Sequence, residues 1–506
     1  MQMKKFINSS FFNFLGNYYV EISIFILFAI LGFIGIAKHE MWRDELQAWM
    51  IARDSVNLAD LFRNIQYEGH PALWHLTLFF ITRFTHNPVW MQYLHVSIAC
   101  GTVFIFLFFS PFNKIQKALF AFGYFPFYEY LIISRSYGLN LFFILLFCLL
   151  NSRRAGLFYQ AIVVFLLTQA NLFGAILAFS LTFFLIFQAL IKKLNSRKIT
   201  LLASSLVIIS GFALCYLQIV PSKGYSGSGN VSGENVSYNF EKTISSVWEA
   251  HMPIPKDSMN FWNSNFINDQ AAEFFLALVL LVFLYLILDF YGNRFILIYY
   301  FATLVLLLFC LLFLNLFAMR YFGMIFAVTV SALWFCLEKI KQNKYNISLK
   351  FFNAFVFVIF FAGFLGGMTA YADDYKYPFS SSLSAAEYIE NNNLNDLEIV
   401  GGMDYAVSAL PGHLDKKIFY LNSQKYGTFI IWNNKRRLFV SLDDIFASAE
   451  KVSEEKNKDV LIILNSDVLN SKLNDNPWKG RIIKSFEMKE GVVEDEKFYG
   501  YRFRKE

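Results

Sequence analysis

Apolar stretches long enough to cross a membrane recur along most of this 506-residue chain. A helix that spans a bilayer needs about 20 mostly apolar residues. Such stretches occur in about eleven places, at 18–38, 89–110, 116–134, 137–151, 157–171, 172–191, 199–220, 272–290, 295–316, 320–338 and 350–371. With 56% hydrophobic residues and 61 phenylalanines, the composition exceeds what one soluble core needs. We therefore expect an α-helical polytopic membrane protein.

The first apolar stretch is expected to remain in the protein as a membrane anchor. The residues before it, MQMKKFINSS, lack the short apolar core and the small-residue cleavage site of a signal peptide. All five cysteines lie inside apolar stretches and none has metal-ligand spacing. We expect them to be small buried side chains, with no disulfide framework.

The positions of lysine and arginine predict which loops face the cytoplasm. The formal net charge of +6 comes mostly from short loops between apolar stretches, such as 192–198. Cytoplasmic loops have this pattern, so no nucleic-acid partner is inferred. The assignment requires that the 14-residue stretch 71–84 lies at the membrane interface and does not cross. It places 39–88, 221–271 and the whole chain after the last span on the exterior face.

Residues 372–506 are expected to form a separate α/β domain on the exterior, periplasmic side. Short apolar runs such as LEIVGG and DVLIILN alternate there with helix-like stretches such as SLDDIFASAEKVSEEK. The segment IVGGMD lacks the GxGxxG spacing of a phosphate loop, so a tight strand-to-helix turn is expected. The glycine- and serine-rich segment 222–237 is typical of a flexible stretch within the second exterior loop.

The first group of polar residues on the expected exterior face follows the first span directly. The segment HEMWRDELQAW, at 39–49, contains Glu40, Arg43, Asp44 and Glu45. Neighbouring residues on a helix point about 100° apart, so the pair Asp44 and Glu45 suits one carboxylate as a base and one in a supporting role. The alternative is a helix N-terminus, which favours acidic residues through its dipole.

The second group lies in the segment YEGHPALWH, which contains Glu68, His70 and His75. Gly69 and Pro71 mark a turn into the short interfacial helix. By default, the two histidines are polar residues of the interface. Zinc binding is the weaker alternative, because a spacing of five places them on different helix faces and no HExxH motif accompanies them.

The third group consists of ionisable residues at the exterior ends of spans, namely Glu129, Arg135 and Arg320. Charges near or within a bilayer are costly and usually face a partner or a water-filled cavity. Each is therefore a functional candidate, and the alternative is that the side chain extends to the lipid headgroups. Two arginines that converge on one site would suit a phosphate, because guanidinium groups bind phosphate through paired hydrogen bonds.

Four short segments, WRDELQAW, YEGHPALWH, SRSYGL and MRYFGM, resemble in order and spacing the motifs of a membrane enzyme family. The family is the GT-C superfamily of polyprenyl-phosphate-sugar-dependent glycosyltransferases, and the nearest relatives are the lipid-A aminoarabinose transferases and the bacterial enzymes similar to protein O-mannosyltransferases. The resemblance covers about residues 15–371. The sequence departs from the family at Ala72, where a second proline is usual, and at Gly138, where alanine is usual.

The resemblance implies an inverting glycosyltransferase of the GT-C type that moves a sugar from a polyprenyl-phosphate-linked donor to a glycan, lipid or protein acceptor. The reaction is expected on the exterior face of the bacterial cytoplasmic (inner) membrane. Asp44 and Glu45 are the predicted catalytic residues. Predicted substrate-binding residues are Arg43, Glu68, His70, Glu129, Arg135, Tyr137 and Arg320. No metal ligand is assigned, and a divalent cation is the one cofactor left open.

The implied reaction also agrees with the residue types. A phosphate leaving group is anionic at neutral pH, so it requires cations more than a proton donor. The acceptor hydroxyl requires a carboxylate that takes its proton as it attacks. Two other classes remain as alternatives. A polytopic transporter should carry charges or broken helices near mid-bilayer in symmetric halves, and a non-catalytic envelope scaffold would leave the arginines beside the acidic loops unexplained.

Overall fold

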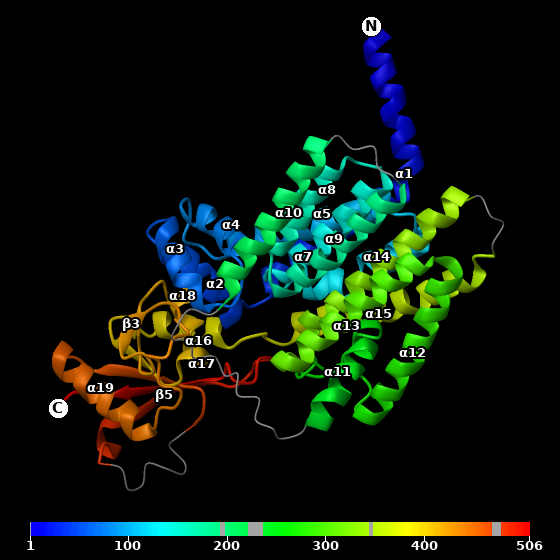
Figure 1. Ribbon diagram of the computed structural model, residues 1–506. Coiled ribbons are helices and arrows are strands. Elements are labelled where there is room, and N and C mark those ends of the chain that lie inside the picture. Colours follow the sequence, from blue (N-terminus) through cyan, green and yellow to red (C-terminus); the bar gives the residue numbers. More distant parts are fainter. Residues whose placement is uncertain (1, 193–197, 221–235, 344–347, 468–476) are drawn as a thin grey trace.

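The computed structural model describes residues 2–192, 198–220, 236–343, 348–467 and 477–506. It contains a bundle of helices followed by a C-terminal domain with one β-sheet, as Figure 1 shows. This arrangement confirms the fold class expected from the sequence, a helical membrane protein with a C-terminal α/β domain. The glycine- and serine-rich segment 222–237 and the basic loop 192–198 fall mostly outside the described residues.

Seven described helices are long and apolar enough to cross a membrane by length and composition. They are α1 (Gln2–Lys38), α5 (Val89–Phe109), α10 (Lys198–Ile219), α12 (Gln270–Tyr291), α13 (Arg294–Leu314), α14 (Met319–Asn343) and α15 (Lys350–Lys376). The bundle also contains α7 (Tyr137–Ser152), α8 (Leu157–Thr168) and α9 (Leu172–Lys192), whose described apolar stretches are shorter, and the more polar α11 (Val236–His251). The chain is therefore a multi-pass helical membrane protein.

The structure contradicts the expected span at 116–134. This segment divides into α6 (Lys114–Ala121), a π-helical turn η2 (Tyr124–Glu129) and an irregular stretch that leads to α7. Pro126 lies in the turn and has no N–H for a helical hydrogen bond. Every residue from 120 to 134 is buried, and non-helical backbone is tolerated within a membrane protein where other protein segments enclose it. Of the other ten expected spans, seven coincide with the long helices named above, and 137–151, 157–171 and 172–191 coincide with the shorter apolar stretches of α7, α8 and α9.

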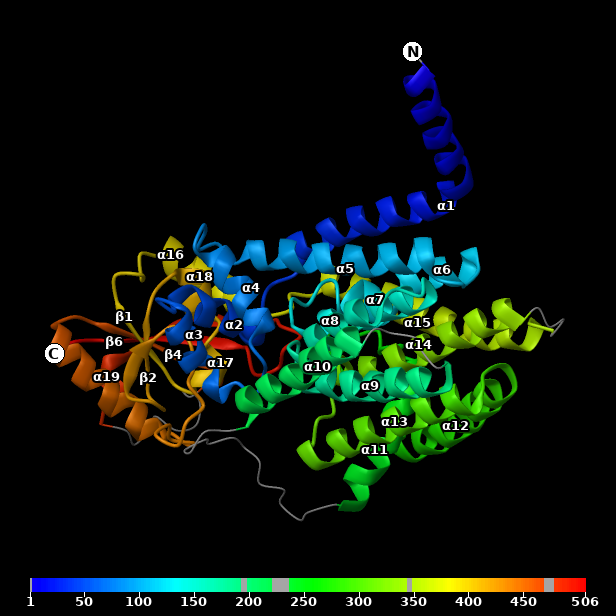
Figure 2. The same ribbon diagram turned by 45° about the horizontal axis from the view of Figure 1, so that its top comes forward.

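The segment between α1 and α5 lies at one end of the bundle, next to the C-terminal domain, as Figure 2 shows. It forms α2 (Arg43–Asp54), α3 (Leu58–Asn64), a short 3₁₀ turn η1 (Ile65–Tyr67) and α4 (Leu73–Thr82). With ten residues, α4 is too short to span a bilayer, as expected for the interfacial segment 71–84.

The C-terminal domain contains a six-stranded mixed sheet with the strand order β3-β2-β1-β4-β6-β5. The strands are β1 (Glu398–Gly401), β2 (Ile418–Tyr420), β3 (Lys425–Gly427), β4 (Val460–Leu464), β5 (Ile482–Met488) and β6 (Phe498–Phe503). The central strand β1 pairs in parallel with β2 and β4, whereas β3, β5 and β6 join by antiparallel pairing. The segment IVGGMD forms the end of β1 and a short turn into a helix, as the missing phosphate-loop spacing predicted.

Helices cover both faces of this sheet. One hydrophobic cluster joins the sheet to α16 (Ser382–Asn391) and α18 (Leu410–Leu414), and a second joins it to α19 (Leu442–Lys456). The short α17 (Asp404–Val407) and α18 also pack against α2, which contacts α4 as well. As a result, nine of the twelve residues of α2 are buried. The first helix after α1 is therefore enclosed by both parts of the protein.

Candidate active site

The two adjacent carboxylates at the start of α2 have different surroundings. Asp44 and Glu45 both lie in the first turn of the helix. The Asp44 side chain is 30% exposed, whereas Glu45 is completely buried. Only Asp44 is thus accessible to a bound substrate, and the structure separates the pair into one accessible and one internal carboxylate.

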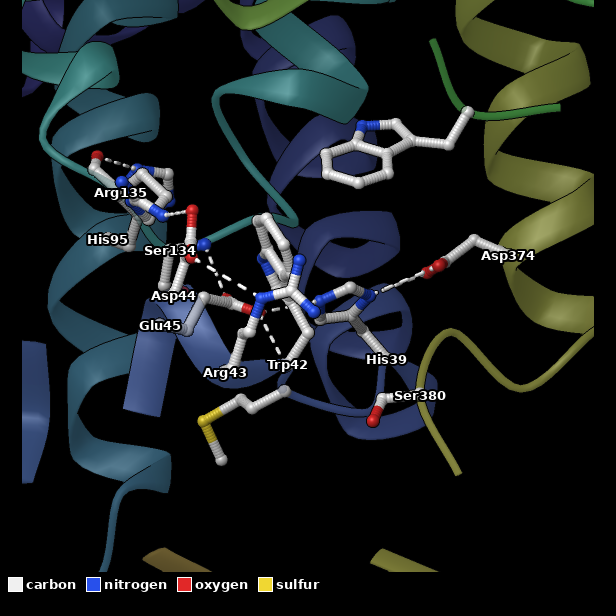
Figure 3. A network of polar contacts seen from close by, with 12 residues as sticks. His39, Trp42, Arg43, Asp44, Glu45, His95, Ser134, Arg135, Asp374 and Ser380 are labelled. Atoms are coloured by element: carbon white, nitrogen blue, oxygen red, sulfur yellow. Dashed lines mark hydrogen bonds and ion pairs between the residues drawn. The ribbon is translucent and has the colours of Figure 1, made fainter. Parts of the chain in front are cut away.

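Glu45 connects three segments of the chain through hydrogen bonds, as Figure 3 shows. Its Oε1 accepts a 2.6 Å bond from the backbone N–H of Ser134, next to Arg135. Its Oε2 accepts bonds from the backbone N–H of Trp42 at 3.2 Å and from Nε2 of His39 at 3.1 Å. Glu45 therefore positions the end of α1, the start of α2 and the stretch that carries Arg135.

His39 is a buried residue between two carboxylates. Its Nε2 contacts Glu45 and its Nδ1 contacts Asp374 of α15, each at 3.1 Å. Burial lowers the pKa of His39, but the two carboxylates outweigh burial and raise this pKa to about 10. His39 is consequently an imidazolium at neutral pH and balances one of the two buried negative charges.

Asp44 faces three guanidinium groups. Arg135 forms an ion pair with its Oδ2, Nη2 of Arg320 lies 3.9 Å from the same oxygen, and Nε of Arg43 lies 3.9 Å from Oδ1. Burial raises the pKa of Asp44, but the cations Arg135, Arg320 and Arg43 outweigh burial and lower it to about 2. The site thus contains one ionised carboxylate and a clear excess of positive charge.

Aromatic rings hold the two arginines that come from the bundle. The guanidinium of Arg320, in the first turn of α14, lies 4.9–5.8 Å from the ring centroids of Tyr321, Trp42 and Trp262. Its Nε is buried and has no hydrogen-bond partner among the described residues. The Arg135 guanidinium lies 5.8 Å from the Tyr137 ring. Cation–π contacts fix the direction of a guanidinium without using its N–H donors. Nη2 of Arg320 donates to the Tyr321 hydroxyl at 3.2 Å, and its Nε remains available to an anion.

The remaining predicted substrate-binding residues surround this cluster. Tyr137, the first residue of α7, packs edge-on against Tyr321 at 5.5 Å between ring centroids. Glu129 is buried in η2 and accepts hydrogen bonds from Trp262 Nε1 and Tyr124 at 3.2 Å each. Glu129 therefore supports the ring of Trp262, which in turn contacts Arg320.

Glu68 and His70 lie on the side of the cluster formed by Arg135. Nε2 of Gln47 donates a 3.0 Å bond to Glu68. Burial raises the pKa of Glu68 to about 7, against the opposing effects of Gln47 and Arg135. The His70 ring packs edge-on against Tyr137, and burial together with Arg135 lowers the pKa of His70 to about 4. His70 is therefore neutral at pH 7.

Two other residues named in the sequence analysis, Glu40 and His75, lie apart from this cluster. Glu40 is half-buried, and burial raises its pKa to about 7. His75 points into the buried face of α4, where neither ring nitrogen has a hydrogen-bond partner among the described residues. Within the part of the chain that the structure describes, no group of three or more His, Cys, Asp and Glu residues is arranged to hold a metal ion.

Several residues of the site escape sequence reasoning. His39 and Trp42 belong to the quoted segment HEMWRDELQAW, and their position beside two acidic residues was the only available signal. Trp262 follows α11 in a segment without a recognisable motif. Asp495 and Glu496 of the C-terminal domain contact Arg43, although more than 450 residues separate them from it.

No family model matches the sequence, and no curated protein matches it. Among solved structures, the chain is similar to the crystal structure of ArnT from Cupriavidus metallidurans bound to undecaprenyl phosphate, with 11% sequence identity and a TM-score of 0.43. The match covers 96% of this chain and 98% of ArnT. At this identity and TM-score, the similarity carries over neither residue roles nor an activity.

Proposed function

We propose that this protein is an inverting glycosyltransferase, which moves a sugar from a polyprenyl-phosphate-linked donor to an acceptor hydroxyl on the exterior face of a bacterial cytoplasmic membrane. One observation carries the proposal: three arginines surround a single accessible carboxylate, Asp44, at the end of a bundle of membrane helices. This arrangement suits a reaction in which an anionic phosphate leaves and a hydroxyl loses its proton.

Arg135 and Arg320 are the proposed phosphate ligands. In the reaction, the bond between the anomeric carbon and the phosphate oxygen breaks and its electron pair stays on the phosphate, which gains one negative charge. The acceptor oxygen bonds to the anomeric carbon from the opposite face, so the configuration inverts. The sugar passes through an oxocarbenium-like state. Fixed guanidinium groups in a partly buried site stabilise the charge that develops on the leaving phosphate.

Asp44 is the proposed general base, and it receives the proton of the acceptor hydroxyl. In the ion pair that the structure shows, the pKa of Asp44 is too low for efficient proton transfer. A donor phosphate competes with Asp44 for Arg135 and Arg320. When these arginines turn to the phosphate, Asp44 loses cations while it stays partly buried, so its pKa rises. Donor binding therefore activates the base, and the donor is expected to bind before the acceptor reacts.

The buried residues around this pair are assigned supporting roles. Glu45 holds Ser134 and hence the backbone next to Arg135, and His39 bridges Glu45 and Asp374 and balances one of their two negative charges. Glu68 and His70 are proposed to bind hydroxyl groups of a substrate, because at neutral pH the histidine is uncharged and the glutamate is close to its titration point. Glu129 acts through Trp262.

A transfer assay separates this function from transport. The full-length protein in membrane vesicles receives a set of polyprenyl-phosphate donors, each with a radiolabelled sugar. The experiment measures label in acceptor material and the release of polyprenyl phosphate, and a parallel assay measures uptake of the free sugar by intact cells. We expect transfer that depends on Asp44. Sugar uptake without any release of polyprenyl phosphate would show a transporter instead.

A further inference from the structure

The turn before β6 places a buried carboxylate at the start of α2. Glu496 is completely buried. Its Oε1 accepts a 2.9 Å hydrogen bond from the backbone N–H of Arg43, the first residue of α2. Its Oε2 accepts a 2.5 Å bond from the Ser380 hydroxyl. The C-terminal domain therefore reaches the helix that carries Asp44 through a specific contact with its first turn.

This contact satisfies a requirement of α2 that its own sequence does not meet. The first N–H groups of a helix have no partner within the helix, and they usually bond to a serine, threonine, aspartate or asparagine at the N-cap. The N-cap of α2 is Trp42, whose side chain makes no such bond. A carboxylate near a helix N-terminus is also stabilised by the helix dipole. Within the helix, Glu45 accepts the N–H of Trp42, and Glu496 supplies the acceptor for the next N–H, that of Arg43.

The neighbouring residue, Asp495, binds the side chain of the same arginine. Nη1 of Arg43 lies 2.7 Å from Asp495 and 3.7 Å from Glu496. The Arg43 guanidinium also lies 5.5 Å from the ring of Tyr405 in α17, another residue of the C-terminal domain. On its other side, Nε of Arg43 lies 3.9 Å from Asp44. Arg43 is therefore shared between the acids of the C-terminal domain and the carboxylate of the site.

We propose that Glu496 is a positioning residue of the transfer site and that, together with Asp495, it fixes Arg43 and the first turn of α2. Through this turn, the C-terminal domain sets the position of Asp44 relative to Arg135 and Arg320. Asp495 also limits how strongly Arg43 pairs with Asp44. The C-terminal domain therefore contributes positioning residues to the site. The inference rests on the proposed function, because the position of Asp44 matters only if Asp44 acts in the reaction.

The test compares Glu496→Gln with Glu494→Gln in the full-length protein. Glu494 is exposed in the same turn, so its variant is a matched control. Glu496→Gln weakens the charged contacts with Arg43, and a displacement of about 1 Å at a reacting group can lower a rate about 100-fold. We expect kcat to fall by about this factor with little change in the KM of the donor, whereas Glu494→Gln should transfer sugar as the wild type does.

Two further measurements separate positioning from general loss of structure. Hydrogen exchange in the peptide 39–49 should accelerate in Glu496→Gln but not in Glu494→Gln, and the strands of the sheet should stay protected in both. Asp495→Asn keeps the contact of Glu496 with the helix, so the loss in kcat should be smaller. In this variant Arg43 moves closer to Asp44, and the acid limb of the pH profile of kcat should shift to lower pH.

The outcomes distinguish this inference from the proposed function. If the wild type transfers sugar and Glu496→Gln does so at the same rate with unchanged exchange in 39–49, the positioning role is wrong and the proposed function stands. If the wild type transfers no sugar from any donor, the proposed function is wrong. The role of Glu496 in transfer is then also wrong, whatever the result of hydrogen exchange in 39–49. If Glu496→Gln does not accumulate, Asp495→Asn decides: a wild-type rate and an unchanged pH profile overturn the inference.

Discussion

Replacement of Asp44 by asparagine should separate donor binding from sugar transfer. The amide keeps the shape of the side chain but cannot accept the proton, so transfer should fall about 100- to 10,000-fold, as is typical for the loss of a general base. Asp44 is 30% exposed and paired with Arg135. A partly exposed ion pair contributes up to about 1 kcal/mol. Removal of this competitor should tighten donor binding by up to about fivefold.

The assay has two parts, both on the purified full-length protein in lipid. One measures equilibrium binding of a polyprenyl-phosphate donor, and the other measures the rate of sugar transfer under single-turnover conditions. Asp289→Asn, a change at an exposed position near the end of α12, is the control for a lost surface carboxylate. A variant Asp44→Asn that transfers sugar at a near wild-type rate would refute the role of Asp44. If Glu45→Gln is inactive in the same experiment, the two carboxylates have exchanged roles.

Three further outcomes follow from the site and its surroundings. Arg135→Lys and Arg320→Lys should each insert normally but transfer sugar about 100-fold more slowly, because lysine keeps the charge and loses the paired donors; wild-type rates in both would favour side chains that merely extend to the headgroups. The pKa of His39 is raised from 6.5 to about 10 in the folded protein, so its stabilising contribution is complete below pH 6.5 and is lost as the pH rises to about 10. Thermal unfolding should therefore shift to lower temperature across this range, and a His39→Gln variant, which has no group to titrate, should lack this component. Reporter fusions after Lys198 and after Glu506 should report the cytoplasm and the exterior, respectively, and a shared compartment would overturn the predicted topology.

The sequence predicted the class of fold because membrane helices and α/β domains have strong periodic signals. The apolar stretches gave ten helices at the expected positions, and the short runs LEIVGG and DVLIILN became the parallel strands β1 and β4. The exception, 116–134, is as apolar as a span. Hydropathy cannot show that protein encloses the segment on all sides, and this enclosure is what permits the turn at Pro126.

The site was predictable in part, for a similar reason. Arg135 and Arg320 stood out as charges at the ends of apolar stretches, and the structure brings both to Asp44. Because Asp44 and Glu45 are adjacent, the sequence could not show which of the two carboxylates is accessible. The burial of Glu45 depends on its contacts with Ser134 and His39. The contact between Glu496 and Arg43 depends on the folding of two separate domains against each other, which no local pattern encodes.

The most direct test of the proposed reaction follows both parts of the donor, the sugar and the polyprenyl phosphate. A donor with one label in the sugar and another in the polyprenyl chain is incubated with the full-length protein and membrane acceptor material, and the anomeric configuration of the product is determined by NMR spectroscopy. The proposed mechanism predicts one polyprenyl phosphate released for each sugar transferred, with inverted configuration, and loss of both signals in Asp44→Asn. A product with retained configuration, or transfer at a near wild-type rate in Asp44→Asn, would contradict it.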